Sequence, residues 1–258
     1  MEQIMVTVGG VDLECFSHGE GVPIVLLPGG SLSVGYLSDL AESLGAAGYR
    51  AVRVNPRGAG ASNGPMEGLT LHDLAGDVAG VIESRELGPA FVLGHAFGNR
   101  VARTVAADRP DLVRGVILVA AGGKVEPRPE AQHALVTLFT PTASEAQVLD
   151  AMQWMVGSPE NAPSVWGRFK DDRAPAAAAS QMAAARATPL EDWWSPAGDA
   201  PYLVIQGTKD EAAPVANGHL LKQELGERVT VVDIPNAGHL QPLEAPGPVV
   251  DAVIAFAR

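Results

Sequence analysis

Residues 91–98 read Phe91-Val92-Leu93-Gly94-His95-Ala96-Phe97-Gly98, an apolar run that ends in a turn with glycines four positions apart. A segment of helical periodicity follows at once, from residue 98 to residue 108. This order predicts a buried strand, a sharp turn and a helix. Gly94 and Gly98 would let strand and helix approach closely around a strained residue. The residue at the centre of the turn is Ala96.

Similar short apolar runs recur along the chain, and continuous runs of this kind are typical of parallel strands buried on both faces. They lie at 24–27, 51–54, 116–119, 202–205 and 229–232, with helical segments at 37–47, 71–83, 215–225 and 248–256. Two alternating segments meet at Gly9-Gly10, which indicates an antiparallel hairpin. The sequence therefore predicts an α/β fold, a mostly parallel sheet of eight strands with helices on both faces.

One stretch interrupts this alternation. Residues 122–196 contain no strand-like run, only helical pieces separated by prolines. We interpret this stretch as a helical cap inserted after the sixth strand, so that residues 1–121 and 197–258 form the core domain. Within the cap, the alanine-rich residues 174–187 predict a single helix.

Composition limits the class of protein and its partners. The chain has 258 residues, 47% of them hydrophobic, and its 18 basic and 30 acidic residues give a net charge of −12. Such a chain suits one globular domain, and its charge argues against nucleic acid or a membrane surface as a partner. A single cysteine, Cys15, and an N-terminus unlike a signal peptide predict a cytoplasmic protein. A homodimer is left open.

The strand, turn and helix around Ala96 resemble the nucleophile elbow of the α/β-hydrolase family, G-x-S-x-G, in every respect except the central residue. In that family the central serine attacks the substrate carbonyl. A methyl group cannot attack a carbonyl, so the resemblance implies that the acyl-enzyme route is closed to the chain as written.

The loop Leu27-Pro28-Gly29-Gly30-Ser31 follows the third predicted strand and resembles the family's oxyanion loop, with Pro28 replacing the usual histidine. The resemblance implies that the backbone N–H groups of Gly30 and Phe97 form the oxyanion hole. The alternative is a Pro-Gly turn without chemistry. Residues 55–62 resemble the family's D-x-R-G-x-G-x-S turn, which is structural.

Two further motifs complete the resemblance, which covers nearly the whole chain. Residues 204–210 match the family's strand ending before the acid, and Asn236-Ala237-Gly238-His239 matches its A-G-H loop. The resemblance therefore implies that Asp210 is the orienting acid and His239 the general base, in the family's order. Ligands bind at the carboxyl ends of strands in open α/β sheets, where these residues fall. No metal-binding motif is present, and we expect neither a metal nor a cofactor.

The cap contains all four tryptophans, together with several phenylalanines and methionines. Such side chains line apolar ligand pockets, so we expect a hydrophobic small-molecule substrate with an ester, a lactone or a cleavable carbon–carbon bond. The candidate substrate-binding residues are Ser31, His133, Trp154, Trp166 and Trp193. The alternative is that the cap residues only pack the cap against the core.

Three hypotheses account for Ala96. The first is an inactivated form of a serine hydrolase, from which the serine has been removed while the other machinery is kept. The second is a natural enzyme that uses His239 and Asp210 as a base dyad for hydrolysis, elimination or cyclisation. The third is a non-catalytic protein that uses the capped cavity to bind a small molecule. The acid, the base and the oxyanion loop are all in place, which favours the first.

Overall fold

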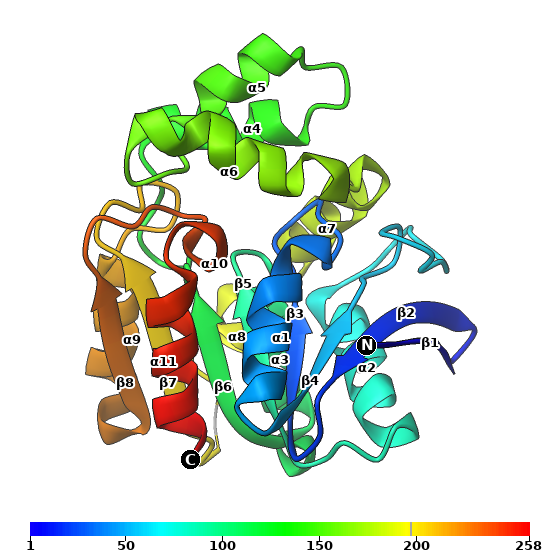
Figure 1. Cartoon of the computed structure of the whole chain (residues 1–258). Coiled ribbons are helices and arrows are strands. Elements are labelled where there is room, and N and C mark those ends of the chain that lie inside the picture. The colour runs from blue at the N-terminus through cyan, green and yellow to red at the C-terminus, as the bar shows by residue number, and fades with distance from the viewer. Residues whose placement is uncertain (197) are drawn as a thin grey trace.

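The computed structural model describes residues 1–196 and 198–258, and its centre is an eight-stranded sheet in the order β1-β2-β4-β3-β5-β6-β7-β8 (Figure 1). β2 is antiparallel to β1 and β4, and all other neighbours are parallel. This confirms the predicted fold class. The strands are β1 (Glu2–Val8), β2 (Val11–His18), β3 (Val22–Leu27), β4 (Tyr49–Val54), β5 (Ala90–His95), β6 (Val113–Val119), β7 (Tyr202–Gly207) and β8 (Val229–Ile234).

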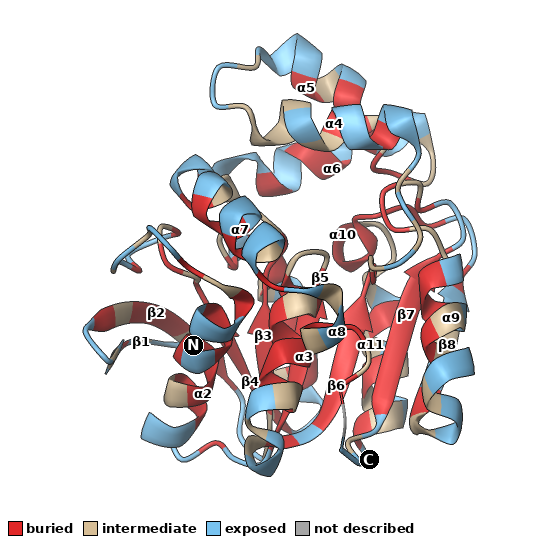
Figure 2. Ribbon diagram, turned by 180° about the vertical axis from the view of Figure 1, so that it is seen from behind, coloured by how far each residue is buried: buried red, intermediate tan, exposed pale blue. Residues whose placement is uncertain are grey.

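Helices cover both faces of the sheet, as Figures 1 and 2 show from opposite sides. Because side chains alternate along a strand, Leu93 of β5 packs toward α1 and α11, whereas Val92 packs toward α2 and α3. Both faces are therefore apolar, which is why the strands appear in the sequence as continuous apolar runs. The flanking helices are α1 (Ser38–Ala46), α2 (Leu71–Ser84), α3 (Gly98–Asp108), α9 (Ala216–Leu225) and α11 (Pro246–Ala257), with the short α10 (Gln241–Glu244) before the last.

Between β6 and β7 the described chain contains helices and no strand. Figure 1 places α4, α5 and α6 as a layer beyond the carboxyl ends of the strands, while α7 and α8 contact α2 and α3 of the core. The boundaries of a separate cap domain stay a prediction. The inserted helices are α4 (Pro129–Phe139), α5 (Glu145–Met152), α6 (Ala162–Phe169), α7 (Pro175–Ala187) and α8 (Leu190–Trp193). Among the described helices, none has both the length and the apolar character needed to cross a membrane.

Candidate active site

The turn between β5 and α3 holds Ala96 in a left-handed backbone conformation, with φ of 48°. For a residue with a side chain this conformation costs about 1 to 2 kcal/mol. Two features maintain it: the N–H of Ala96 donates to the carbonyl of Val119, at 3.0 Å, and Gly98 presses against β3. A Cβ on Gly98 would lie 2.7 Å from the carbonyl oxygen of Leu27, so glycine is required there. The turn thus presents the side chain of residue 96 at the carboxyl end of β5.

The loop after β3 lies directly beside this turn. A Cβ on Gly29 would be 3.5 Å from the Cβ of Ala96, and one on Gly30 would be 3.4 Å from the Cβ of Phe97. The backbone N–H groups of Gly30 and Phe97 donate no hydrogen bond to any residue that the structure describes. Two unbonded N–H groups from adjoining turns can bind a developing oxyanion, which is the role expected of them.

Contacts from the inserted helices hold the oxyanion loop in place. The N–H of Ser31 donates to Oε1 of Gln181, on α7, at 2.7 Å, and the carbonyl of Ser31 accepts from the N–H of Ala174 at 2.7 Å. Ser31 itself has a left-handed φ of 56°. The position of the oxyanion loop therefore depends on one side chain and one backbone N–H that come from residues far along the chain.

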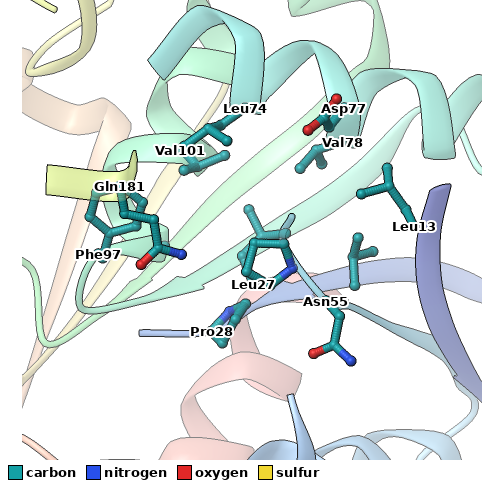
Figure 3. Close-up of a pocket in the computed structure, with 13 residues that line it drawn as sticks. Leu13, Leu27, Pro28, Asn55, Leu74, Asp77, Val78, Phe97, Val101 and Gln181 are labelled. Carbon is teal, nitrogen blue, oxygen red and sulfur yellow. The ribbon is translucent and has the colours of Figure 1, made fainter. Parts of the chain in front are cut away.

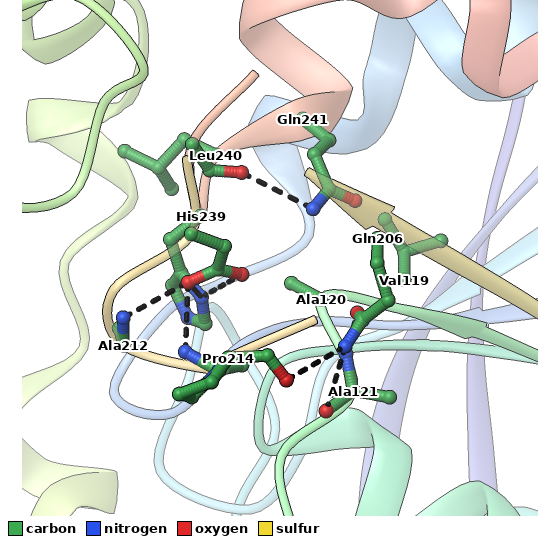
Figure 4. Close-up of polar contacts among 12 residues, drawn as sticks. Val119, Ala120, Ala121, Gln206, Ala212, Pro214, His239, Leu240 and Gln241 are labelled. Atoms are coloured by element: carbon green, nitrogen blue, oxygen red, sulfur yellow. Dashed lines mark hydrogen bonds and ion pairs between the residues drawn. The ribbon is translucent and has the colours of Figure 1, made fainter. Parts of the chain in front are cut away.

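Asp210 and His239 meet at the carboxyl ends of β7 and β8. Nδ1 of His239 lies 3.0 and 3.1 Å from the two carboxylate oxygens of Asp210, and both residues are buried. Asp210 also accepts from the N–H groups of Ala212 and Ala213, at 3.0 and 2.7 Å, as Figure 4 shows for Ala212. Nδ1 is therefore the protonated nitrogen, and Nε2 of His239 has no partner among the described residues.

The electrostatic surroundings set the pKa of His239. Burial alone would lower this pKa, because it disfavours the imidazolium ion. The negative charge of Asp210 and its hydrogen bond to the ring act in the opposite direction, with a further contribution from Glu244. The net effect raises the pKa of His239 above its usual value of 6.5, so the ring is a stronger base than free histidine.

Glu244 also fixes the backbone on either side of His239. Its carboxylate accepts from the N–H of Gly238 at 3.2 Å, from that of Leu240 at 3.1 Å and from that of Gly157 at 2.6 Å. The carboxylate thus joins the histidine loop to the segment that follows α5. Burial raises the pKa of Glu244, although these hydrogen bonds lower it.

His95 precedes Ala96 and points inward, with 1% of its surface exposed. Its Nδ1 lies 2.7 Å from the hydroxyl of Tyr36, and its Nε2 lies 2.9 Å from the carbonyl of His239. The Tyr36 hydroxyl also accepts from the N–H of Gly29, at 2.8 Å. Burial, together with the charge of nearby His239, lowers the pKa of His95 to about 3, so the ring is neutral at ordinary pH.

Ala96, Gly30 and His239 line a common cavity of about 40 Å³ under the inserted helices. The rest of its wall is mainly apolar, and the other lining residues are Gly29, Ser31, Leu32, His95, Leu135, Leu138, Phe139, Met155, Phe169, Arg173 and Leu240. A site for a small organic ligand is typically about 300 Å³ or more, so the structure is a closed arrangement.

The five candidate substrate-binding residues occupy different places. Ser31 lines this cavity, whereas His133 and Trp154 line a separate groove between α4 and α5. Trp166 is buried in α6 against Phe169, which does line the cavity. Trp193 stacks near Arg103 of α3, at the base of the insertion. The structure therefore brings Ser31 to the site, and the binding roles of all five stay predictions.

A second cavity, of about 30 Å³, lies on the other side of the oxyanion loop (Figure 3). Leu27 and Pro28 border it from the loop, and Gln181 and Phe97 lie together at one end. Neither Ala96 nor His239 borders this cavity. It is a small packing gap between the core and α7, and Phe97 and Gln181 both line it.

Three residues near the site were not predicted from the sequence: Tyr36, Gln181 and Arg173. Tyr36 supports His95, Gln181 holds the oxyanion loop, and Arg173 lines the cavity. One signal was available: Gln181 is the single long polar side chain in the alanine-rich segment 174–187 apart from Arg186. A polar residue on the buried side of such a helix indicates a specific acceptor or donor role.

Comparison with known proteins identifies the class. The chain matches a family described as alpha/beta hydrolase fold over residues 22–246, which is most of its length. It therefore belongs to the α/β-hydrolase fold family.

Particular relatives include hydrolases of several kinds. Rhodomycin D methylesterase DauP, from Streptomyces sp. strain C5, is 25% identical over 96% of this chain and 96% of its own length. A 2-(acetamidomethylene)succinate hydrolase from Mesorhizobium japonicum is 39% identical over 28% of this chain and 26% of its own. The enol-lactonase structure from Burkholderia xenovorans LB400 has a TM-score of 0.81 at 24% identity, covering 98% of this chain and 99% of that one. The chain spans less than half the length of several curated relatives that it matches.

Proposed function

We propose that this chain carries the site of a hydrolase for small hydrophobic esters or lactones, with Ala96 at the position of the nucleophile. One observation carries the proposal. The Cβ of Ala96 is held in the strained conformation of a nucleophile elbow, within a cavity shared with Gly30 and His239. The retained strain supports an elbow built for a reacting side chain, because strained backbone is concentrated at functional sites.

A serine at position 96 would complete an acyl-transfer mechanism. Its hydroxyl proton would pass to Nε2 of His239 as Oγ attacks the substrate carbonyl, and Asp210 would stabilise the resulting imidazolium. The N–H groups of Gly30 and Phe97 would bind the tetrahedral oxyanion. His239 would then give the proton to the leaving alkoxide, and water would release the acid by the reverse steps. In the chain as written this route is closed, so a substrate that binds by it stays intact.

The second candidate function is hydrolysis by direct attack of a water molecule. This route needs no nucleophilic side chain at position 96. A cavity of about 40 Å³ beside His239 has room for a water molecule, and Nε2 of His239 has no partner among the described residues. His239 would take a proton from that water as its oxygen attacks the carbonyl bound at Gly30 and Phe97. In serine hydrolases, the groups that remain after loss of a triad member still give about 10³- to 10⁴-fold catalysis over water.

The lining and the named relatives both support the proposed substrate class. Leu135, Leu138, Phe139 and Phe169 surround the cavity with apolar surface, which suits a hydrophobic acyl or alcohol group. DauP is a methylesterase, and the Burkholderia protein is an enol-lactonase. We therefore place esters and lactones ahead of carbon–carbon cleavage.

Two proteins test the proposal: the chain as written and its Ala96→Ser variant. The serine variant should react with a fluorophosphonate and should hydrolyse p-nitrophenyl esters and simple lactones at least 10²-fold faster than the chain as written. Adding Ser31→Ala should leave the fluorophosphonate label in place, because Ser31 is not the attacking group. Adding His239→Ala should abolish both label and turnover.

The other outcomes discriminate among the alternatives. Turnover by the chain as written that disappears in His239→Ala would support direct water attack. A serine variant that folds normally, binds esters and neither labels nor hydrolyses would overturn the proposal and favour a binding protein.

A further inference from the structure

Arg173 is one of the residues that line the mainly apolar cavity, and it is the one residue with a guanidinium among them. The residue lies between α6 and α7 and forms an isolated antiparallel bridge with Leu32 of the oxyanion loop. Residues paired in this way project their side chains to the same side, and Leu32 lines the cavity as well. Hydrogen bonds of 2.7 Å on both sides of Arg173, from Ser33 N–H to the Asp172 carbonyl and from Ala174 N–H to the Ser31 carbonyl, fix this register.

Only part of the Arg173 guanidinium is used by the protein. Its Nη2 donates to the carbonyl oxygens of Leu138 and Thr140, at 2.8 and 3.0 Å, where α4 ends. Its Nε and Nη1 groups donate to no residue that the structure describes. Neither nitrogen is fully buried, so both can be reached by a ligand or by water. No described carboxylate lies within ion-pair distance of Arg173 either. An acidic chain with a net charge of −12 thus leaves this cation without a counter-ion at its cavity.

The surroundings of Arg173 contain more hydrogen-bond donors than acceptors. The guanidinium carbon lies 5.9 Å from the centre of the Trp166 ring, and the indole N–H of Trp166 is buried with no acceptor among the described residues. Buried donors without acceptors are rare in folded proteins, and they call for an explanation. Trp166 does not line the cavity, so an acceptor on a ligand there would meet the Nε and Nη1 groups of Arg173 and not this indole N–H.

The charge of Arg173 and the apolar lining of the cavity together indicate which kind of acceptor group a ligand would carry. One guanidinium balances one negative charge, and the cavity has no second arginine or lysine to balance a phosphate dianion. Apart from Arg173, Ser31 and the two histidines, the walls are apolar, with Leu135, Phe139 and Phe169 on the inserted helices. A ligand that matches both Arg173 and the apolar walls has a carboxylate at one end and an apolar body that carries the scissile carbonyl.

We propose that the site takes an ester or lactone that also bears a carboxylate, and that Arg173 binds this carboxylate. The inference rests on the proposed function, because it places the scissile carbonyl at Ala96. It makes Arg173 the residue that selects acidic over neutral substrates. Its other contacts, with the carbonyl groups at the end of α4, would couple binding of the carboxylate to closure of that helix over the site.

The chain as written allows a direct binding test, because acyl transfer is closed in it. Isothermal titration would compare the monoethyl half-esters of succinate, glutarate and adipate with the matching neutral diethyl esters. At least one half-ester should bind about 10-fold or more tightly than its diester, and its affinity should fall as sodium chloride is added. Arg173→Gln should weaken that half-ester about 10- to 100-fold and change the diester by less than about 3-fold.

Two control variants separate charge from folding. Arg186→Gln removes the same charge from the exposed side of α7 and should leave both affinities unchanged. Arg173→Lys keeps the charge and should retain part of the preference even where Arg173→Gln loosens α4. Equal weakening of half-ester and diester, or a half-ester affinity that neither exceeds that of the diester nor depends on salt, would overturn the assignment.

Hydrolysis by Ala96→Ser distinguishes failure of this inference from failure of the proposed function. A serine variant that cleaves neutral esters and shows no preference for half-esters would keep the proposed function and remove the role of Arg173. Salt-dependent binding of half-esters without cleavage of any ester would keep the carboxylate site and remove the proposed function.

Discussion

Nε2 of His95 lies 2.9 Å from the carbonyl oxygen of His239, so the residue before the elbow position contacts the backbone of the candidate base. The protons of this network can be assigned. The Tyr36 hydroxyl accepts from the N–H of Gly29, so its own proton is free to go to Nδ1 of His95. A neutral His95 then carries its proton on Nε2 and donates it to His239. One chain of hydrogen bonds thus connects the oxyanion loop, the elbow and the histidine loop.

Tyr36→Phe should disturb the site while leaving the fold intact. It removes the acceptor of the Gly29 N–H and the donor to His95, at a cost of about 1 to 3 kcal/mol in the free energy of unfolding. In Ala96→Ser we expect kcat to fall about 10-fold with little change in KM, because positioning is lost rather than binding. ¹⁵N NMR of the histidines should show His95 leaving its Nε2–H tautomer. Tyr49→Phe, a matched variant at another buried tyrosine, should alter neither reading.

The lowered pKa of His95 makes the fold sensitive to acid. The unfolded chain protonates His95 near pH 6.5, whereas the folded chain does so near pH 3. Stability from this group is therefore complete above pH 6.5 and is lost as the pH falls toward 3. Between pH 7.5 and 4.5 the loss should be about 3 kcal/mol. His239 contributes to the pH dependence of stability with the opposite sign. This contribution is present in both the parent chain and His95→Gln, so it cancels when the two proteins are compared. Urea unfolding of His95→Gln should show a correspondingly shallower pH dependence, and parallel curves for the two proteins would contradict the assignment.

The raised pKa of His239 sets the pH dependence of catalysis. A general base must be neutral to accept a proton, so kcat/KM of Ala96→Ser should increase with pH through an inflection above 6.5. In Asp210→Asn burial acts without the opposing carboxylate, and the inflection should move below 6.5 as the rate falls about 10⁴-fold. A pH profile of kcat/KM for both proteins checks this. An inflection that stays in place in Asp210→Asn would assign the titration to another group.

Burial explains how much of the fold could be predicted. The strands β3 and β5 are covered on both faces, so their apolar runs are continuous and were identifiable from sequence. The bounds of α3, Gly98–Asp108, agree with the predicted helix, which begins at the second glycine of the turn and ends just before Pro110. The packing of α7 and α8 against the core was not predicted, since the choice of partner for a helix depends on tertiary contacts.

The residues of the candidate site fall into two groups: those that belong to a local sequence motif and those that only long-range contacts bring to the site. Asp210, His239 and Gly30 follow strands directly, so their motifs predicted that they would lie at one edge of the sheet. Contacts between distant segments left no local pattern. Gln181 reaches Ser31 across 150 positions of sequence, and Arg173 is brought to the cavity by its bridge to the oxyanion loop. Such pairs form only in the folded chain, so composition points to the tryptophans of the insertion and gives no sign of Arg173.

Asp77→Asn tests the ion pair that joins α2 to the turn after β4. Asp77 of α2 forms a two-point ion pair with Arg57, at 2.7 and 2.9 Å, and about a tenth of each side chain is exposed. Neutralising the acid leaves a buried guanidinium without a counter-charge, so the free energy of unfolding should fall by about 3 kcal/mol. The double variant Arg57→Met with Asp77→Leu should recover much of this loss in urea titrations. A double variant as unstable as Asp77→Asn would mean that packing, rather than the unpaired charge, determines the effect.

Gln181→Leu should slow the acyl-transfer reaction although Gln181 lies outside the acid–base pair. Its Oε1 accepts the N–H of Ser31 at 2.7 Å, and Figure 3 shows the side chain beside Phe97. Without that acceptor the Ser31 N–H is unsatisfied, and the adjoining N–H of Gly30 loses its fixed direction toward the oxyanion. We expect kcat of Ala96→Ser on p-nitrophenyl acetate to fall about 10-fold, with KM nearly constant. Gln181→Glu retains an acceptor at the same atom and should restore most of kcat. Equal losses in the leucine and glutamate variants, or a change confined to KM, would show that Gln181 acts through packing or substrate contact instead.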